Sequence, residues 1–399
     1  MSVPVYPMTR ATGCPFDPPP QLRDLQDEAP LVKVQVFDRT AWLVTRYADQ
    51  RKLLADPRLS SDVGKPGYPN SVARPLKSDE DTGIGFILMD DPEHSRLRRM
   101  VTAPFMIKRV EAMRPRVQEI VDELIDDLLA GPKPVDLVTA FALPVPSLVI
   151  CRLLGVPYED HDFFQQNSKT LIRTSASVEE RTEARNNIGR YLNELMGEKL
   201  ANPQDDLLSG LAERVKAGEL TRRDAAGIGV LLLIAGHETT ANMIALGTLA
   251  LLEHPDQLAV LRETEDPKLV AGAVEELLRY LNITHNGRRR AVLEDIEFAG
   301  EVLKTGDGVI FPNDLGNRDA DAFPDPDRLD VTRDARHHIA FGFGVHQCLG
   351  QPLARMELQV VYSTLYRRIP TLRRAVGLDE IPFKHDGAVY GVYSLPVTW

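Results

Sequence analysis

Apolar and polar residues alternate near the start of the chain, and this pattern predicts β-structure. Valines alternate with Lys and Gln over residues 32–36, and a second apolar run follows at 41–44 after a polar turn, which is typical of a β-hairpin. A second strand-rich stretch is predicted over 288–311, where turn signals separate short apolar runs. Residues 388–399 are also strand-like, whereas weak periodicity with Gly, Pro and Ser predicts a long loop over 59–88.

Helical patterns dominate the rest of the chain, from Pro92 to about residue 265 and again over 351–368. Residues 221–253 predict one long helix, which begins at a capping-box-like Thr and is apolar on nearly all faces, so we expect it to be buried. The Pro- and Asp-rich segment 319–330 is predicted to be irregular. Without repeats or a dividing linker, the pattern favours a single domain over 1–399, mainly α with small β-sheets.

Composition and charge narrow the class of protein. The formal net charge of −11 argues against a general nucleic-acid binder. Three cysteines imply no disulfide framework and favour a reducing cytoplasm. The Pro-rich N-terminus lacks the apolar run of a signal peptide, and the twelve uncharged residues at 225–236 are too few to span a membrane. We therefore expect a soluble, cytoplasmic protein that does not bind a membrane.

Cys348 is the first candidate for chemistry. It follows a glycine-rich stretch with Phe341 and Gly344, precedes Gly350, and stands just before a predicted helix. Glycines permit a tight loop against a flat ligand, and a thiolate near a helix start is a soft ligand suited to iron. A lone cysteine is more often a buried structural residue; Cys14 and Cys151 lack such a context, and we prefer structural roles for both.

A second candidate lies in the middle of the long helix, where His237, Glu238, Thr239 and Thr240 follow Ala235-Gly236. A buried carboxylate is unfavourable unless it is paired or used, and small residues beside it let a bulky group approach. A solvated polar notch is the alternative. A zinc-protease motif would need a histidine at position 241, where the chain has Ala241, so that alternative is rejected.

These segments together resemble the cytochrome P450 family, over nearly the whole chain from the Asp91-Pro92-Glu93-His94 segment to the C-terminus. The family carries Phe-x-x-Gly-x-x-x-Cys-x-Gly around its haem ligand and Ala-Gly-x-Glu-Thr-Thr in its oxygen-activating helix. The resemblance implies the P450 fold, with haem b held between the long central helix and the helix after the cysteine loop. Cys348 would bind the iron, Thr239 would assist oxygen activation, and Glu238 would help deliver protons.

The resemblance also implies supporting residues. Glu276 and Arg279, three apart on one helix, would form a structural lock with Arg328 from the Pro-rich segment. His94, Arg98, Arg290 and His346 match propionate-binding positions, and Ala235, Phe341 and Gly350 would also contact the haem. The loops at 59–88 and 165–185 would move to admit ligand. The implied substrate pocket consists of Ile84, Ile87, Leu88, Leu231, Ile234, Asn286, Val389 and Tyr390, with Ala235 beside them.

The expected activity is hydroxylation of a bulky, mostly apolar small molecule, of the polyketide, sterol, statin or xenobiotic type, by a monomer. Two electrons would come from a ferredoxin or flavodoxin fed by an NAD(P)H-dependent reductase. The candidates for a basic docking surface are Arg96, Arg99, Lys108, Arg109 and Arg355. Two alternatives are a haem protein that binds ligand without turnover and a relative that uses peroxide directly. Glu238 and Thr239 argue against both, because neither needs a proton relay.

Overall fold

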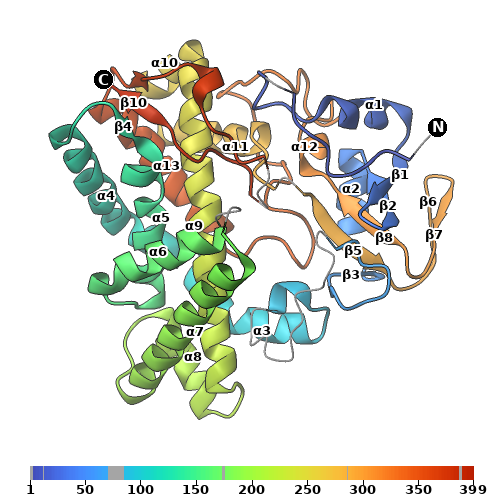
Figure 1. Ribbon diagram of the computed structural model, residues 1–399, viewed down its shortest axis with the longest axis horizontal. Coiled ribbons are helices and arrows are strands. Elements are labelled where there is room, and N and C mark those ends of the chain that lie inside the picture. Colours follow the sequence, from blue (N-terminus) through green and yellow to red (C-terminus); the bar gives the residue numbers. More distant parts are fainter. Residues whose placement is uncertain (1–2, 12, 71–84, 173–175, 285, 386–388) are drawn as a thin grey trace. The chain divides into compact units, whose positions relative to one another are not determined.

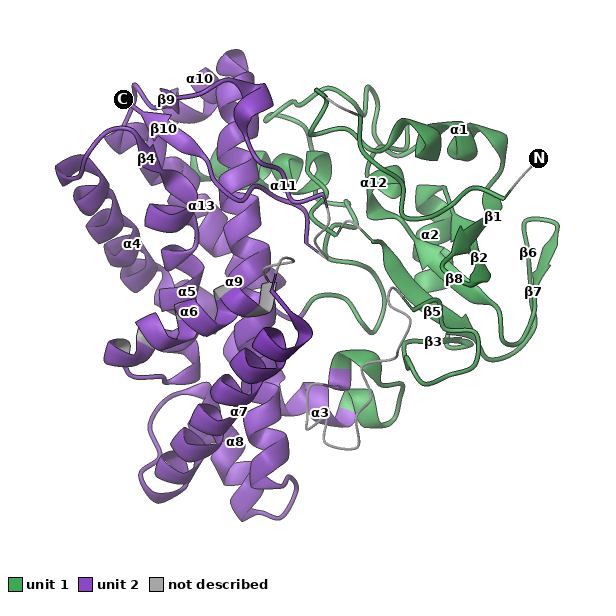
Figure 2. Ribbon diagram, viewed as in Figure 1, with its two compact units in different colours: residues 1–80, 87–95, 265–348 green, residues 81–86, 96–264, 349–399 purple. Residues whose placement is uncertain are grey.

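Helices hold 53% of the chain, which confirms the predicted mainly α class. The computed structural model describes residues 3–11, 13–70, 85–172, 176–284, 286–385 and 389–399. Two compact units are distinguished in Figure 2: unit 1 contains residues 1–80, 87–95 and 265–348, and unit 2 contains 81–86, 96–264 and 349–399. Each unit draws on separated segments of the chain, and a single domain over 1–399 stays a prediction.

Unit 1 is built around a five-stranded sheet in the order β1-β2-β8-β5-β3 (Figure 1). The strands are β1 (Leu31–Val36), β2 (Arg39–Val44), β3 (Leu59–Ser60), β5 (Arg288–Val292) and β8 (Gly308–Phe311). The predicted hairpin is confirmed as β1 paired antiparallel with β2, while β2 and β8 run parallel. Alternate side chains fill two cores: Leu43 and Ile310 enter one, and Trp42 and Val309 enter the other, as the period of two requires.

Unit 1 also contains several helices and a second hairpin. They are α1 (Pro20–Glu28), α2 (Tyr47–Leu54), α11 (Pro267–Tyr280), α12 (Asn313–Gly316) and the hairpin of β6 (Ile296–Phe298) with β7 (Glu301–Leu303). Helix α3 (Glu93–Thr102) and the short helix η1 (Phe86–Leu88) have residues in both units. The segment 319–330 contains no helix or strand, as predicted.

Unit 2 is a set of helices packed around α9 (Figure 1). The longer helices are α4 (Ile107–Ala130), α5 (Pro144–Leu154), α6 (His161–Ile172), α7 (Val178–Ala201), α8 (Leu207–Lys216), α9 (Arg222–Glu253), α10 (Pro255–Glu263) and α13 (Gln351–Arg368). The short helical turns are η2 (Ala103–Phe105), η3 (Val138–Ala142), η4 (Tyr158–Asp160) and η5 (Leu378–Glu380). A small sheet joins β4 (Val135–Asp136), β10 (Pro396–Thr398) and β9 (Arg373–Arg374).

The long helix predicted over 221–253 is confirmed as α9, and the last one as α13. Thr221 and Asp224 form a reciprocal capping box at the start of α9. Among the described residues, α9 is the helix long and apolar enough to cross a membrane, but 78% of its most apolar window is buried inside the structure. This burial is typical of the central helix of a water-soluble fold.

Two predicted loops differ from the structure. Residues 165–185 were expected to be a loop, but α6 continues to Ile172 and α7 begins at Val178. Helix α7 starts with a capping box between Ser177 and Glu180, which the sequence pattern of Ser and Glu three apart would have indicated. Of the loop predicted at 59–88, residues 71–84 lie outside the described part, and the rest contains β3 and η1.

Candidate functional site

The Cys348 loop belongs to unit 1, and the thiol at its end is exposed. The Cys348 amide donates a hydrogen bond to the Phe341 carbonyl oxygen at 2.8 Å. Gly342 and Gly344 have φ values of +78° and +77°, a backbone region that favours glycine. A Cβ atom on Gly344 would lie 2.7 Å from the Leu54 carbonyl oxygen, so the loop runs directly against the end of α2. Backbone contacts therefore hold the loop and leave the sulfur accessible.

A half-buried arginine, Arg288, lies beside this loop. The Arg288 guanidinium donates a hydrogen bond from Nη2 to the Ala340 carbonyl oxygen at 2.9 Å. Burial and, to a smaller extent, the nearby Arg290 lower the pKa of Arg288 to about 10, although Cys348 acts to raise it. An arginine that interacts electrostatically with Cys348 favours the thiolate over the thiol, because an opposite charge stabilises the ionised form.

The histidines predicted to hold propionates meet in unit 1. The ring centroids of His94 and His346 are 4.0 Å apart, and His94 is buried. Arg290 is also buried, and its Nη1 donates to the Arg289 carbonyl oxygen at 2.7 Å. Burial lowers the pKa of Arg290, because a low-dielectric environment disfavours its positive charge. An anionic ligand bound beside it would stabilise that charge. The half-buried Arg98 lies one turn after His94 on α3 and belongs to unit 2.

Glu238 is buried in the middle of α9, at 4% exposure. Its Oε1 atom accepts hydrogen bonds from the Asn242 Nδ2 atom at 2.7 Å and from the Lys384 Nζ atom at 2.9 Å. The neighbouring Thr239 hydroxyl donates to the Ala235 carbonyl oxygen at 2.7 Å, one turn earlier on the same helix. The acid and the alcohol are therefore both hydrogen-bonded, but to different partners: within α9, Glu238 bonds to a residue one turn later and Thr239 to a residue one turn earlier.

The face of α9 beside this pair is open. Ala235 is exposed, and Ile234 and Thr239 are half-buried, although α9 is buried over 225–233 and 240–251. His237, by contrast, is buried in the core. Its pKa is lowered, mainly because burial disfavours the charged imidazolium; Glu238 and the Leu143 backbone oppose this shift, and Lys384 adds to it. The small Ala235 thus gives a bulky group access to α9 within reach of Thr239.

The lock predicted from Glu276 and Arg279 is present in unit 1, with a different third side chain. Arg279 donates to Glu276 from Nε at 2.6 Å and from Nη2 at 2.8 Å. The arginine side chain that joins them is Arg333, whose Nε lies 3.2 Å from Glu276 Oε1. Arg328 takes part through its carbonyl oxygen, 3.2 Å from Arg279 Nη2, while its own side chain is 67% exposed. The prediction of Arg328 as the third side chain was wrong, because the turn after Pro326 directs its carbonyl, and not its guanidinium, toward α11.

The residues predicted to contact substrate are divided between the units. Ile84 lies outside the described residues. In unit 1, Ile87 is exposed and Leu88 and Asn286 are half-buried; in unit 2, Leu231 and Tyr390 are buried and Ile234 and Val389 are half-buried. Tyr390 stacks on Phe383, with ring centroids 6.1 Å apart. Their shared contact with one ligand stays a prediction.

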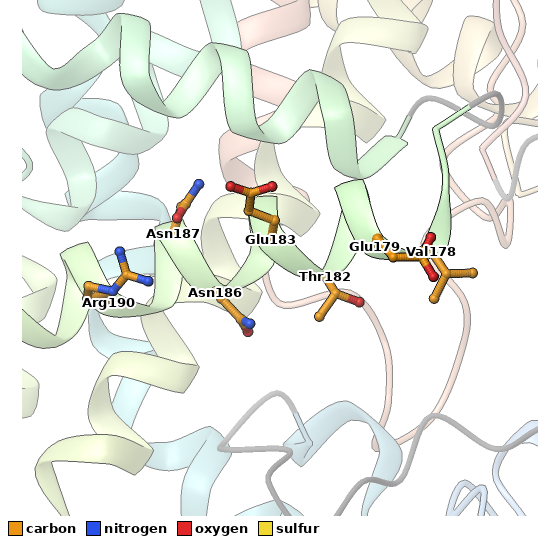
Figure 3. Close-up of a pocket in the computed structure, with 7 residues that line it drawn as sticks. All are labelled: Val178, Glu179, Thr182, Glu183, Asn186, Asn187 and Arg190. Atoms are coloured by element: carbon orange, nitrogen blue, oxygen red, sulfur yellow. The ribbon is translucent and has the colours of Figure 1, made fainter.

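A cavity of about 520 Å³ lies along α7, within unit 2. The described residues that line it all come from that one helix: Val178, Glu179, Thr182, Glu183, Asn186, Asn187 and Arg190. Figure 3 shows Glu183 and Asn187 pointing away from the side on which Thr182 and Asn186 lie. None of these residues belongs to the predicted site.

Three partners of the predicted residues were missed from the sequence. Asn242 stands one turn after Glu238, a spacing that places both side chains on one helix face and could have indicated the contact. Arg333 lies in the irregular segment after Arg328, where no periodicity fixes a side-chain direction. Lys384 is 146 residues from Glu238, and no local pattern predicts such a pairing.

The donor set fits haem. Among the described residues, no group of three or more His, Cys, Asp and Glu could hold a metal ion. Cys348 instead offers one exposed sulfur, which suits an iron already bound by a porphyrin. His346, whose ring lies tilted against that of His94, and the buried Arg290 are the kinds of donor that would suit haem propionates.

Comparisons with known proteins give a consistent result. Residues 21–369 match the family model described as Cytochrome P450. Cytochrome P450 GfsF of Streptomyces halstedii is 58% identical over 399 residues, which cover 99% of this chain and 96% of that protein. The crystal structure of GfsF superposes with a TM-score of 0.93 and 57% identity, covering 100% of both chains.

Two further relatives carry a compound in their names. Vitamin D3 dihydroxylase of Streptomyces griseolus is 46% identical over 399 residues, 99% of this chain and 97% of that protein. The crystal structure of CYP105P1 in complex with filipin I has a TM-score of 0.91 and 41% identity, and covers 100% of this chain and 99% of that one.

Proposed function

This chain belongs to the cytochrome P450 family and is a haem b-dependent monooxygenase, and on that premise we propose that it hydroxylates a bulky, mostly apolar small molecule in the cytoplasm. One atom of O2 enters a C–H bond of the substrate as a hydroxyl group. The other atom takes up two electrons and two protons and leaves as water. The haem iron supplies the oxygen activation when it is bound, and Cys348 is the residue that would bind it.

The observation that carries this proposal is the arrangement on α9. Glu238 is buried directly after the open face at Ala235, and Thr239 stands at that face. A carboxylate next to a hydroxyl can pass protons inward from water, since both groups accept and donate protons. His94, His346 and Arg290 would bind the propionates, and the buried Glu276–Arg279 pair would keep the segment before the cysteine loop in place.

The proposed substrate class rests on two arguments. The predicted contact residues are mainly apolar, with Asn286 and Tyr390 as polar exceptions, which suits a large apolar ligand with a few oriented polar groups. Relatives act on bulky compounds such as macrolides and vitamin D3. A macrolide or secosteroid scaffold is therefore the class to test first.

The proposed electron donor is an acidic ferredoxin or flavodoxin, fed by an NAD(P)H-dependent reductase, that binds a basic surface of unit 2. Met106 and Ile107 are 59% and 72% exposed at the start of α4, and exposed Lys108 and Arg109 follow them. A cavity of about 410 Å³ lies between the starts of α4 and α13, lined in part by Ile107 and Arg355. Exposed apolar side chains beside cations suit an acidic partner that docks transiently.

One experiment tests the proposed activity. The purified protein is reduced under carbon monoxide, then titrated with vitamin D3 and filipin I, with citrate as a polar control. We expect a strongly red-shifted Soret band, a spectral shift with at least one apolar compound, and a hydroxylated product when NADPH, ferredoxin and reductase are added. The Cys348→Ser variant should lose the red-shifted band. Equal product from peroxide alone would favour the peroxide-using alternative, and ligand shifts without any product would favour a binding protein.

A further inference from the structure

Lys384 makes a buried ion pair with the acid on α9. The Lys384 Nζ atom lies 2.9 Å from Glu238 Oε1, and the two side chains are 10% and 5% exposed. Asn242 donates to the same oxygen at 2.7 Å. The carboxylate is thus held by two donors, whereas the Thr239 hydroxyl is engaged separately with the Ala235 carbonyl oxygen.

Lys384 comes from a hairpin at the C-terminal end, here called the C-terminal hairpin, which comprises the described residues 382–385 and 389–393. Its two arms are joined by hydrogen bonds from the Lys384 amide to the Gly391 carbonyl oxygen and from the Tyr393 amide to the Pro382 carbonyl oxygen, both at 2.8 Å. Phe383 pairs with Val392 as an isolated bridge. A change in one arm is therefore transmitted to the other.

The same hairpin lies directly against α9 at the second donor. A Cβ atom on Gly391 would fall 1.7 Å from Asn242 Oδ1, so this glycine permits a backbone approach that no other residue allows. Tyr390, the residue before it, is buried and stacks on Phe383. The two donors to Glu238 are thus a hairpin side chain and a helix side chain that the hairpin touches.

The buried ion pair between Lys384 and Glu238 is not explained by stability alone. Removing two charges from water is unfavourable, and apolar residues of similar volume are often at least as stabilising. Neighbouring His237 does not supply the compensating charge, because burial lowers its pKa and keeps it neutral. Lys384 therefore balances the charge of the Glu238 carboxylate and also fixes its direction. A residue with both effects can determine when the carboxylate is able to move and transfer protons.

We propose that Lys384 is a positioning residue that holds Glu238 away from Thr239 until substrate contacts the C-terminal hairpin. The inference rests on the proposed function, in which Val389 and Tyr390 touch substrate and Glu238 delivers protons. Contact with the hairpin loosens the bond from Lys384. The carboxylate then takes up a proton from water, turns toward Thr239 and passes that proton on, which returns it to the ionised form that Lys384 binds. Proton delivery is thereby coupled to the presence of substrate.

The test compares Lys384→Met, Lys384→Arg and a matched control, Lys199→Met, in the haem-loaded enzyme. Lys199 makes another buried ion pair in unit 2, with Asp206 at 2.5 Å and side-chain exposures of 6% each. The first readout is NADPH oxidation with ferredoxin and reductase but without substrate. The second is amide hydrogen exchange of the C-terminal hairpin, measured by mass spectrometry with and without vitamin D3.

We expect Lys384→Met to raise substrate-free NADPH oxidation about fivefold or more, the lower end of typical coupling between sites, and to speed exchange in the hairpin. Lys384→Arg should stay within about twofold of the wild type, since it keeps the charge. Lys199→Met should leave both readouts unchanged. In a Glu238→Gln background, Lys384→Met should have no further effect on NADPH oxidation, because it acts through the carboxylate.

Equal behaviour of Lys384→Met and Lys199→Met in both readouts would overturn the inference and leave Lys384 as a structural residue. So would an undiminished effect of Lys384→Met in the Glu238→Gln background. These outcomes are distinct from failure of the proposed function, in which the wild type itself lacks the red-shifted Soret band or gives no spectral shift with an apolar compound.

Discussion

Arg279 holds both carboxylate oxygens of Glu276, from Nε to Oε2 at 2.6 Å and from Nη2 to Oε1 at 2.8 Å, and neither side chain is exposed. The pair is completed from the irregular segment that follows α12, since the Asp330 amide donates to Glu276 Oε1 at 3.0 Å and Arg279 Nη1 donates to the Pro326 carbonyl oxygen at 2.7 Å. One buried ion pair on α11 therefore fixes a segment that has no helix or strand of its own.

Arg333 and Arg328 should differ sharply when each is replaced by alanine. Arg333→Ala removes a cation from a carboxylate with no exposed surface, and we expect it to lower the free energy of unfolding by about 1–3 kcal/mol. Arg328→Ala removes an exposed side chain and keeps the carbonyl oxygen that Arg279 uses, so its effect should stay within about 0.5 kcal/mol. Urea denaturation of both variants measures the difference; equal losses would show that the Arg328 side chain belongs to the lock after all.

Gly344→Ala should damage the cysteine loop more than a glycine of similar backbone conformation elsewhere. Gly344 and Gly300 have φ values of +77° and +83°, but a Cβ on Gly344 would lie 2.7 Å from the Leu54 carbonyl oxygen, whereas nothing lies within 4 Å of one on Gly300. Gly300→Ala should therefore lower the free energy of unfolding by only about 1–2 kcal/mol, the conformational cost alone. Gly344→Ala should lose more than this and should also reduce the red-shifted Soret band per mole of protein. A loss of stability equal to that of Gly300→Ala, with an intact band, would contradict the close packing of the loop.

Charge reversal on the basic surface should slow electron transfer without affecting the haem. In Lys108→Glu/Arg109→Glu, two exposed cations beside Ile107 become anions, and we expect the apparent Kd for ferredoxin to rise about tenfold or more at low salt, because like charges are brought together. The effect should shrink as ionic strength rises, since exposed charges are screened. Lys216→Glu on α8, also exposed, is the control. If it weakens ferredoxin binding equally, the overall charge and not this surface controls docking.

The sequence predicted those parts of the molecule that have a period or a motif. The alternation of apolar and polar residues predicted β1 and β2. A segment that is apolar on all faces, with a capping Thr before it and a Pro after it, predicted both ends of α9 to within one residue. The motifs placed Cys348, Glu238 and Thr239 on the correct kinds of element. The start of α7 was missed because its polar residues hide the period, although Ser177 and Glu180 mark it.

What could not be predicted are contacts that depend on side-chain direction in irregular segments or on distant parts of the chain. Arg328 and Arg333 lie close together in one irregular segment, and only the path of that segment decides that Arg333 reaches Glu276. Lys384 meets Glu238 because a hairpin with a glycine at position 391 can lie against Asn242. Neither periodicity nor local spacing carries this information.

Glu357 should make the protein less stable as pH rises. This carboxyl group is buried on α13, burial raises its pKa well above the usual value, and no described residue hydrogen-bonds to its Oε2 atom. In the folded protein it stays protonated, whereas in the unfolded chain it ionises above about pH 4.5. The unfolded state then binds fewer protons, so the free energy of unfolding falls with pH above that value, by at most about 1.4 kcal/mol per pH unit for this one proton.

Glu357→Gln removes this proton but keeps the shape of the side chain, so its stability relative to the wild type should increase steadily between about pH 5 and pH 7. Urea denaturation at several pH values measures the two slopes, with Glu263→Gln, an exposed glutamate on α10, as the control that should track the wild type. Parallel slopes for Glu357→Gln and the wild type would mean that the folded protein holds Glu357 ionised, through a partner that burial alone does not supply.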